Sequence, residues 1–356
     1  MTNDIRQRLT GIHAATIVPM TDDFCIDEAA LEQHIASVAG TSGIRGLLVN
    51  GHAGENFVLS AAEKRRVVEI ARAVTPVSCL ICSGVNAESS LEVAREAESA
   101  EAAGADILLV FPPNSWALGH DEACVELHHA HVRGACSLPL LIYGAPVGAG
   151  QMAYSPTVLQ RLAEEPRIIG VKEGSWEVAA YEANRRLLKS IRPDFVVMGS
   201  GDEHLLTSYI VGSDGSQVSL AAVVPELLVA LYERAEVGDW SGARAVHELI
   251  YPLAAAIYRA PPGGRATARL KACLNILGRL QKPAVRPPQP PVLDSDVASL
   301  ERALAAAGIG NKPQLAGRDL DLNTADHDSG RCQDGLKGHD RCLGGRPKDR
   351  HFHQRD

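Results

Sequence analysis

Lys172 is the residue whose type and position most directly suggest chemistry. It ends the apolar run IIGVK, residues 168–172, and is followed at once by polar residues. An ammonium group at the end of a buried strand loses hydration, which lowers the pKa of the amine. A lysine with a lowered pKa can attack a ketone and form a Schiff base. The alternative is a lysine that packs its aliphatic stem and keeps its charge in water.

Two other apolar runs end in residues that could act together with Lys172. The run 46–50 leads into the glycine-rich turn GHAGE, residues 51–55, and the run 138–143 ends in Tyr143. Alone, such a tyrosine is more often a packing residue, and a short glycine-rich turn is weaker still. In a barrel of parallel strands, however, all carboxyl ends meet at the mouth that holds the active site. An amine, a phenol and a turn at one mouth therefore predict a catalytic site.

The elements that would position these residues form a regular pattern. From residue 12 to about 240, short apolar runs alternate with longer amphipathic segments at a spacing of roughly 30 residues, which is typical of a βα repeat. Eight strands with eight crossovers predict an α/β fold of the closed (β/α)8 TIM barrel type, because a doubly wound sheet usually has fewer strands. Strands are expected at 13–18, 46–50, 78–82, 107–111, 138–143, 168–172, 195–199 and 215–220, and helices, among others, at 27–39, 60–73, 87–103 and 121–133.

The barrel is expected to span residues 11–240, followed by a C-terminal helical extension over 241–309. Helices are predicted there at 239–259, 266–280 and 294–307, with the proline-rich segment 286–291 between the last two. The tail, residues 310–356, has hardly any large apolar residues and is predicted to be disordered. Its His339, Cys342, His351 and His353 fit no compact ligand set, so we predict no metal site and no cofactor.

Composition narrows the class of protein. The formal net charge of -8 leaves no basic surface for nucleic acid. No apolar run approaches the roughly 18 residues of a membrane-spanning helix. The polar first residues do not resemble a signal peptide, so a cytoplasmic protein is expected. The acidic charge balance favours a small molecule or a protein as partner.

The 8 cysteines are scattered along the chain and are expected to be reduced thiols. Cys79 and Cys82 form a C-x-x-C pair within the strand expected at 78–82. Residues three apart on a strand face opposite sides, which favours core packing over a redox or zinc role.

From about Gly11 to about Gly308, the chain resembles the pyruvate-dependent class I lyases typified by dihydrodipicolinate synthase and N-acetylneuraminate lyase. The residues at 51–55 are similar to the G-x-x-G-E turn of that family, those at 143–146 (YGAP) to its Y-x-x-P, and those at 170–173 (GVKE) to its G-x-K-[ED]. The segments 199–203 and 212–216 resemble the loops after its seventh and eighth strands. For these two loops, ordinary tight turns or a phosphate site are the alternatives.

The resemblance implies a role for each matched residue. Lys172 would form the Schiff base with pyruvate or another 2-oxo acid, and Tyr143 would act as general acid and base. The backbone N–H groups at His52 and Ala53 would bind the carboxylate of the 2-oxo acid, and Glu55 would brace the turn. The resemblance also implies a homo-oligomer, a dimer or a tetramer. The further substrate-binding positions are Gly51, Gly54, Gly201 and Val218.

The chain departs from dihydrodipicolinate synthases at three places. Their turn carries two threonines, one of which relays protons to the tyrosine, where this chain has His52 and Ala53. They have a tyrosine after the fourth strand, donated across a subunit interface, where this chain reads PPNSW at 112–116. They also have an arginine after the Y-x-x-P, where this chain reads VGAG at 147–150. Lysine biosynthesis is therefore the less favoured assignment.

His52 has two interpretations. A neutral imidazole with the ordinary pKa near 6.5 could replace the relay hydroxyl, or the side chain only fills the turn.

These observations predict a Schiff-base lyase that acts on a 2-oxo acid. It would be an aldolase that also handles an aldehyde, or a dehydratase or deaminase. One alternative is a family member without turnover that binds a 2-oxo acid as a sensor or assembly partner, and another is an actual dihydrodipicolinate synthase. A metal-dependent hydrolase is disfavoured, because the first strand offers His13 but no H-x-H pair.

Overall fold

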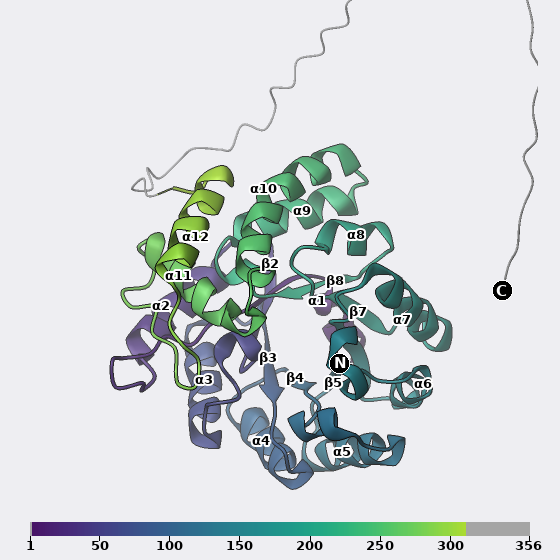
Figure 1. The fold of residues 1–356 in the computed structure, drawn as a ribbon. Coiled ribbons are helices and arrows are strands. Elements are labelled where there is room, and N and C mark those ends of the chain that lie inside the picture. Colours follow the sequence, from purple (N-terminus) through teal and green to yellow (C-terminus); the bar gives the residue numbers. More distant parts are fainter. Residues whose placement is uncertain (1, 311–356) are drawn as a thin grey trace, which may run out of the picture. The chain divides into compact units, whose positions relative to one another are not determined.

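Eight parallel strands close into a barrel in the computed structural model, which describes residues 2–310. Each strand pairs with the next along the chain, and β8 closes the barrel by pairing with β1. The predicted TIM barrel is thus confirmed. Figure 1 shows the helices around the strands. The strands are β1 (Gly11–Ala15), β2 (Ile44–Val49), β3 (Leu80–Val85), β4 (Ile107–Val110), β5 (Leu140–Gly144), β6 (Ile168–Glu173), β7 (Val196–Gly199) and β8 (Gly215–Val218).

Several helices begin where the sequence places capping residues. Ser60 and Glu63 form a capping box at the start of α3, and Asp27 caps α2. Pro156 and Pro225 occupy the first turns of α6 and α9, where a missing N–H is tolerated. The helices up to the end of the barrel are α1 (Thr2–Leu9), α2 (Glu28–Ala39), α3 (Ala61–Val74), α4 (Ser90–Ala102), α5 (Glu122–Ala135), α6 (Pro156–Glu164), α7 (Val178–Ile191), α8 (Leu205–Ile210) and α9 (Pro225–Glu236).

Some predicted boundaries shift by a few residues. β3 begins at Leu80 rather than at residue 78, because Cys79 donates its N–H to Pro76 in a turn. Cys79 and Cys82 are both buried, and burial raises the pKa of both thiols, to about 11 and about 12, which suits core packing. Helix α11 ends at Ile276 rather than at residue 280, because Gly278 takes a left-handed backbone (φ 69) that stops the helix.

Three helices follow the barrel: α10 (Trp240–Tyr258), α11 (Ala266–Ile276) and α12 (Asp294–Ala306). They pack on one another, and α10 also packs on α9, on one side of the barrel (Figure 1). The described residues form a single compact unit. The division at residue 240 stays a prediction. The expected disordered tail, which includes His339, Cys342, His351 and His353, lies outside the described residues except for Gly310.

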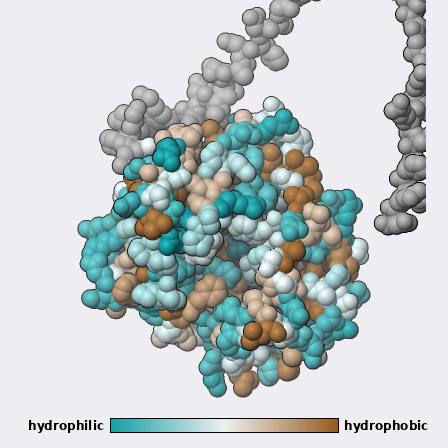
Figure 2. Space-filling model, in the orientation of Figure 1, coloured by the Kyte–Doolittle hydropathy of each residue, from teal (hydrophilic) through white to brown (hydrophobic). Residues whose placement is uncertain are grey.

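The face of the molecule in Figure 2 is largely hydrophilic, with hydrophobic residues in small separate patches. Among residues 2–310, none of the helices combines the length and the apolarity that crossing a bilayer requires.

Candidate active site

A cavity of about 430 Å³ lies at the carboxyl ends of the strands and brings the predicted catalytic residues together. Lys172, Tyr143 and His52 all line it, although they come from β6, β5 and the short 3-10 turn η1 (His52–Gly54) after β2. The structure thus places the amine, the phenol and the glycine-rich turn at one mouth.

Lys172 lies one residue before the end of β6, paired in register with Tyr143 on β5 and Met198 on β7. Its Nζ is 6.0 Å from the centre of the Tyr143 ring. Burial lowers the pKa of Lys172 to about 8, and the Asp202 carboxylate opposes this shift. At neutral pH a much larger share of this amine is neutral than of an ordinary lysine, so it is prepared for attack on a carbonyl.

Tyr143 is buried beside the amine. Burial, with a contribution from Glu173, raises the pKa of its phenol well above 10. The phenol is therefore protonated at neutral pH and can act first as a proton donor. Its ring lies 4.7 Å from that of Phe111 and 5.2 Å from that of His52, measured between ring centres. These contacts hold the ring beside Lys172.

His52 lies in an aromatic cluster. Its ring centre is 4.6 Å from the ring centres of both Phe57 and Phe111. Burial lowers the pKa of His52 to about 3, with a smaller contribution from the positive charge of Lys172. This direction disfavours the interpretation in which the imidazole titrates near 6.5, and the role of His52 as a proton relay stays a prediction. The imidazole is neutral across the physiological range.

The η1 turn offers two backbone donors to an anion. The N–H groups of His52 and Ala53 are the first of a 3-10 turn, and such groups have no partner within the turn. Gly51 and Gly54 close the turn through the Gly54 N–H, which donates to the Gly51 carbonyl at 3.0 Å. Ala53 lines the cavity. The turn thus has the donors that the predicted carboxylate site requires.

The C-terminal helices hold this turn from behind. Glu55 is almost fully buried, binds the buried Lys271 of α11, and accepts the backbone N–H of Arg286 at 2.8 Å. Thr267, also on α11, donates to the His52 carbonyl at 3.3 Å. Glu55 therefore acts as the brace that the sequence analysis expects.

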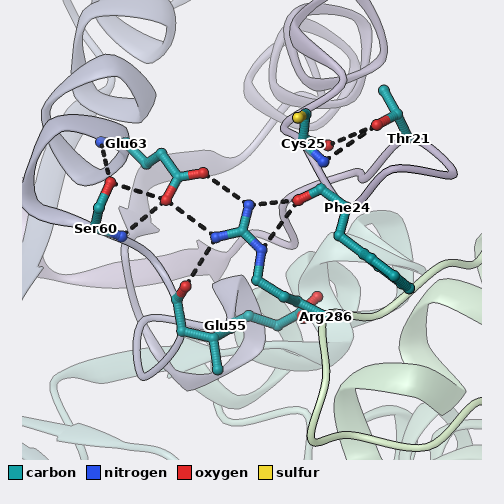
Figure 3. Close-up of polar contacts among 8 residues, drawn as sticks. Thr21, Phe24, Cys25, Glu55, Ser60, Glu63 and Arg286 are labelled. Carbon is teal, nitrogen blue, oxygen red and sulfur yellow. Dashed lines mark hydrogen bonds and ion pairs between the residues drawn. The ribbon is translucent and has the colours of Figure 1, made fainter.

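Arg286 extends the brace into the first turn of α3. Figure 3 shows its guanidinium between the Glu63 carboxylate and the Phe24 carbonyl, with Glu63 also bonded to Ser60. The Nη2 of Arg286 lies 2.7 Å from Glu63. The extension after the barrel therefore helps to shape the site.

Two predicted substrate-binding positions lie away from the cavity wall. Val218 is buried on β8 between Gln217 and Ser219, which both line the cavity, so alternation along the strand turns its side chain to the helices. Gly201 lines a small adjoining cavity together with Trp176 and Ser200. A substrate contact at either position stays a prediction.

Several cavity residues were not identified from the sequence. Asp202 is buried, its Oδ1 accepts the Leu220 N–H at 2.7 Å, and burial raises the pKa of its carboxyl to about 7. Tyr258 comes from α10 and bonds to Ser219 at 2.6 Å. Trp176 has a left-handed backbone (φ 61) and meets Tyr258 edge-on at 5.7 Å. Asp202 lies in a loop that the sequence singled out, but nothing in the sequence pattern indicated a residue from α10.

The charges of the cavity are few. Among the described residues that line it, Lys172 is the only cation and Asp202 the only carboxylate. The arginine and the tyrosine of dihydrodipicolinate synthases have no counterpart in the corresponding segments. The segment after β4 instead buries Trp116, which stacks on His120 with 4.7 Å between ring centres.

A closed barrel with a half-buried strand-end lysine beside a phenol is the arrangement expected of a Schiff-base-forming lyase. Comparison with known proteins gives the family. Residues 8–307 match the model of the dihydrodipicolinate synthetase family. The chain belongs to this family of pyruvate-dependent lyases.

The relatives span nearly the whole described chain. The 4-hydroxy-tetrahydrodipicolinate synthase of Nitrobacter hamburgensis is 30% identical over 86% of this chain and 99% of its own. An uncharacterized DapA-like lyase of Thermococcus onnurineus is 28% identical over 81% of this chain and 95% of its own. Among solved structures, YagE from E. coli K12, a prophage protein of this family determined with pyruvate, has a TM-score of 0.78 at 24% identity, covering 85% of this chain and 99% of its own.

Proposed function

We propose that this protein is a lyase that forms a Schiff base between Lys172 and pyruvate or another 2-oxo acid. The observation that carries the proposal is the cavity in which an amine of lowered pKa, a protonated phenol and the N–H groups of η1 meet. The reaction would make or break a bond at C3 of the 2-oxo acid, as an aldolase, a dehydratase or a deaminase does. The pyruvate-bound relative supports the first substrate.

Each residue has a distinct step. The backbone N–H groups of His52 and Ala53 hold the carboxylate of the 2-oxo acid. The neutral Lys172 amine attacks the carbonyl carbon, and Tyr143 gives a proton to the oxygen that leaves as water. The protonated imine then draws electrons from C3. The phenolate left on Tyr143 then takes up the proton that C3 loses, which restores the phenol for the next cycle.

The second substrate is expected to lack an anionic group. Lys172 is the only cation among the described residues that line the cavity, and the protonated imine that it forms is already balanced by the carboxylate of the 2-oxo acid. A carboxylate or phosphate on the second substrate would meet Asp202 without a compensating cation. This favours a neutral aldehyde, or a neutral leaving group, over a second substrate with a carboxylate, which dihydrodipicolinate synthases hold with their arginine. We therefore keep dihydrodipicolinate synthase activity as the second candidate, supported by the names of the relatives.

A turnover assay tests the proposal. The protein is incubated with pyruvate and a panel of neutral aldehydes and aspartate semialdehyde, and loss of the 2-oxo acid is followed. We expect turnover with at least one neutral aldehyde, or lyase activity on the corresponding hydroxylated 2-oxo acids. Imine formation without turnover on any panel member would instead support a 2-oxo-acid-binding protein that is not an enzyme.

Tyr143→Phe is predicted to lower kcat by on the order of 10²-fold or more, because the variant has no phenolic proton to transfer. The ring and its contacts with Phe111 and His52 stay, so KM should change little. Steady-state kinetics measure both values. Tyr181→Phe is a matched control, since that tyrosine is buried on α7 outside the catalytic cavity. If Tyr143→Phe kept the wild-type kcat, Tyr143 would contribute packing and not proton transfer.

The rate of imine formation is predicted to rise with pH and to level off above about 8, because only the neutral amine attacks and the pKa of Lys172 is about 8. Asp202→Asn removes a carboxylate that raises this pKa, so the rising part of the pH–rate profile should move to lower pH. His52, neutral down to a pKa of about 3, should add no limb near 6.5. Stopped-flow measurement of imine formation checks all three. If Asp202→Asn shifted the pH–rate profile to higher pH, Asp202 would not raise the pKa of Lys172.

Two further expectations remain proposals. We place the protein in the cytoplasm and expect a homo-oligomer, either a dimer or a tetramer, by similarity to the family. Analytical ultracentrifugation measures the oligomeric state.

A further inference from the structure

Gln217 is a buried amide with no adequate partner. It lies on β8, is 0% exposed, and forms part of the wall of the cavity that contains Lys172. Neither its Oε1 nor its Nε2 has a hydrogen-bond partner among the described residues, apart from a weak interaction with the thiol of Cys82. Native proteins seldom leave a buried amide in this state, because desolvation is then not compensated. A partner is therefore expected to come from the cavity.

The register of the barrel fixes where this amide points. Gln217 pairs with His13 on β1, and Ala15, two residues after His13, also lines the cavity. Side chains two apart on a strand face the same side, so Gln217 faces the barrel interior below Ser219. The ring nitrogens of His13 also have no side-chain partner. A buried water between His13 and Gln217 is thus the alternative to a substrate group.

The shape of a bound 2-oxo acid shows which of its atoms would meet Gln217. This step rests on the proposed imine at Lys172. The carbonyl carbon has three neighbours: the imine nitrogen, the carboxylate and C3. β6, which carries Lys172, lies four strands from β2, so the η1 turn that would bind the carboxylate faces the lysine across the barrel.

Within the ring of strands, the two directions left for C3 lead toward β4 and toward β8. The β4 side is filled by Phe111, which is 1% exposed and contacts both His52 and Tyr143. The β8 side is lined by Gln217 and Ser219. C3 and its substituent therefore face the amide of Gln217.

We propose that Gln217 binds a hydroxyl group on C3 of the 2-oxo acid, so that the preferred nucleophilic substrate is a 3-hydroxy-2-oxo acid rather than pyruvate. A hydroxyl fits because it both donates and accepts, as the amide does. A methyl group would leave both amide atoms without a partner. A second carboxylate would accept a hydrogen bond from the amide nitrogen, but it has no proton to donate to the amide oxygen. The site therefore selects its substrate at the atom where the new bond forms.

The test compares pyruvate and 3-hydroxypyruvate as probes. The intact chain is incubated with each compound and reduced with borohydride, and the adduct is quantified by intact-mass spectrometry. The measured quantity is the concentration of each compound that gives half-maximal trapping. We expect 3-hydroxypyruvate to need about 10- to 100-fold less than pyruvate, because pyruvate leaves a buried polar group unpaired. Gln217→Leu should reverse the preference, since an apolar side chain of similar size suits a methyl group. Gln217→Met repeats the test should the leucine variant not fold.

Ser216→Ala is the matched control, because it removes a hydroxyl that binds Tyr209 on the helix side of the same strand. It should keep the wild-type preference. The proposal is overturned if the wild type prefers pyruvate, or if Gln217→Leu keeps the wild-type ratio, which is the result expected of a water between Gln217 and His13. If the wild type traps neither compound, the proposed Schiff-base function itself fails, and the two failures are thus distinct.

Discussion

Lys172→Ala is expected to lower turnover by on the order of 10⁴-fold or more, since alanine has no amine to form the imine. The fold should remain intact. The ammonium of the half-buried Lys172 loses part of its hydration in the fold, so its removal relieves an unfavourable contribution to stability. Activity and thermal unfolding of the same preparation measure the two effects.

Lys282→Ala provides the comparison, because this lysine is half exposed and pairs with Asp22 at the surface. It should keep wild-type activity. Turnover in the Lys172 variant within a few-fold of the wild type would place the nucleophile elsewhere. An unfolded Lys172 variant would show instead that the residue has a structural role.

Lys271→Met is expected to lower the free energy of unfolding by about 3–5 kcal/mol, because it leaves the buried Glu55 carboxylate without its cation. The backbone N–H of Arg286 would still donate to this carboxylate, but a neutral donor does not balance the negative charge of Glu55. Since Glu55 ends the η1 turn, the KM for the 2-oxo acid should rise as well. Urea unfolding and steady-state kinetics measure the two effects.

The double variant Glu55→Gln with Lys271→Met should recover much of the lost stability, because no uncompensated charge is then buried. Lys282→Met is the surface control and should change stability by only about 0–1 kcal/mol. A Lys271 variant no less stable than this control would mean that the buried pair does not brace the turn.

Much of the fold could be predicted from the chain itself. The strands correspond to apolar runs that recur about every 30 residues. Ser60 and Glu63, three residues apart, mark the start of α3. The proposed catalytic residues Lys172 and Tyr143 stand out because each polar side chain ends an apolar run. Such signals are local, so they can be recognised without the structure.

The rest of the site depends on contacts between distant residues. Lys271 and Glu55 are 216 positions apart, and neither carries a local sign of its partner. Tyr258 reaches the mouth from α10, whose amphipathic pattern does not indicate which residue enters a cavity. The pKa of His52 follows from the rings around it, not from its position in a turn. Gln217 did carry a signal, an amide within an expected interior strand, but its lack of partners is visible only in the structure.

Borohydride trapping of the wild-type chain with 2-oxo acids tests the central claim most directly. The protein is incubated with pyruvate or 3-hydroxypyruvate, reduced, digested, and its peptides are identified by mass spectrometry. The account predicts one reduced adduct per chain, located on Lys172. Adducts on another lysine, or turnover of a 2-oxo acid without any adduct at Lys172, would contradict it.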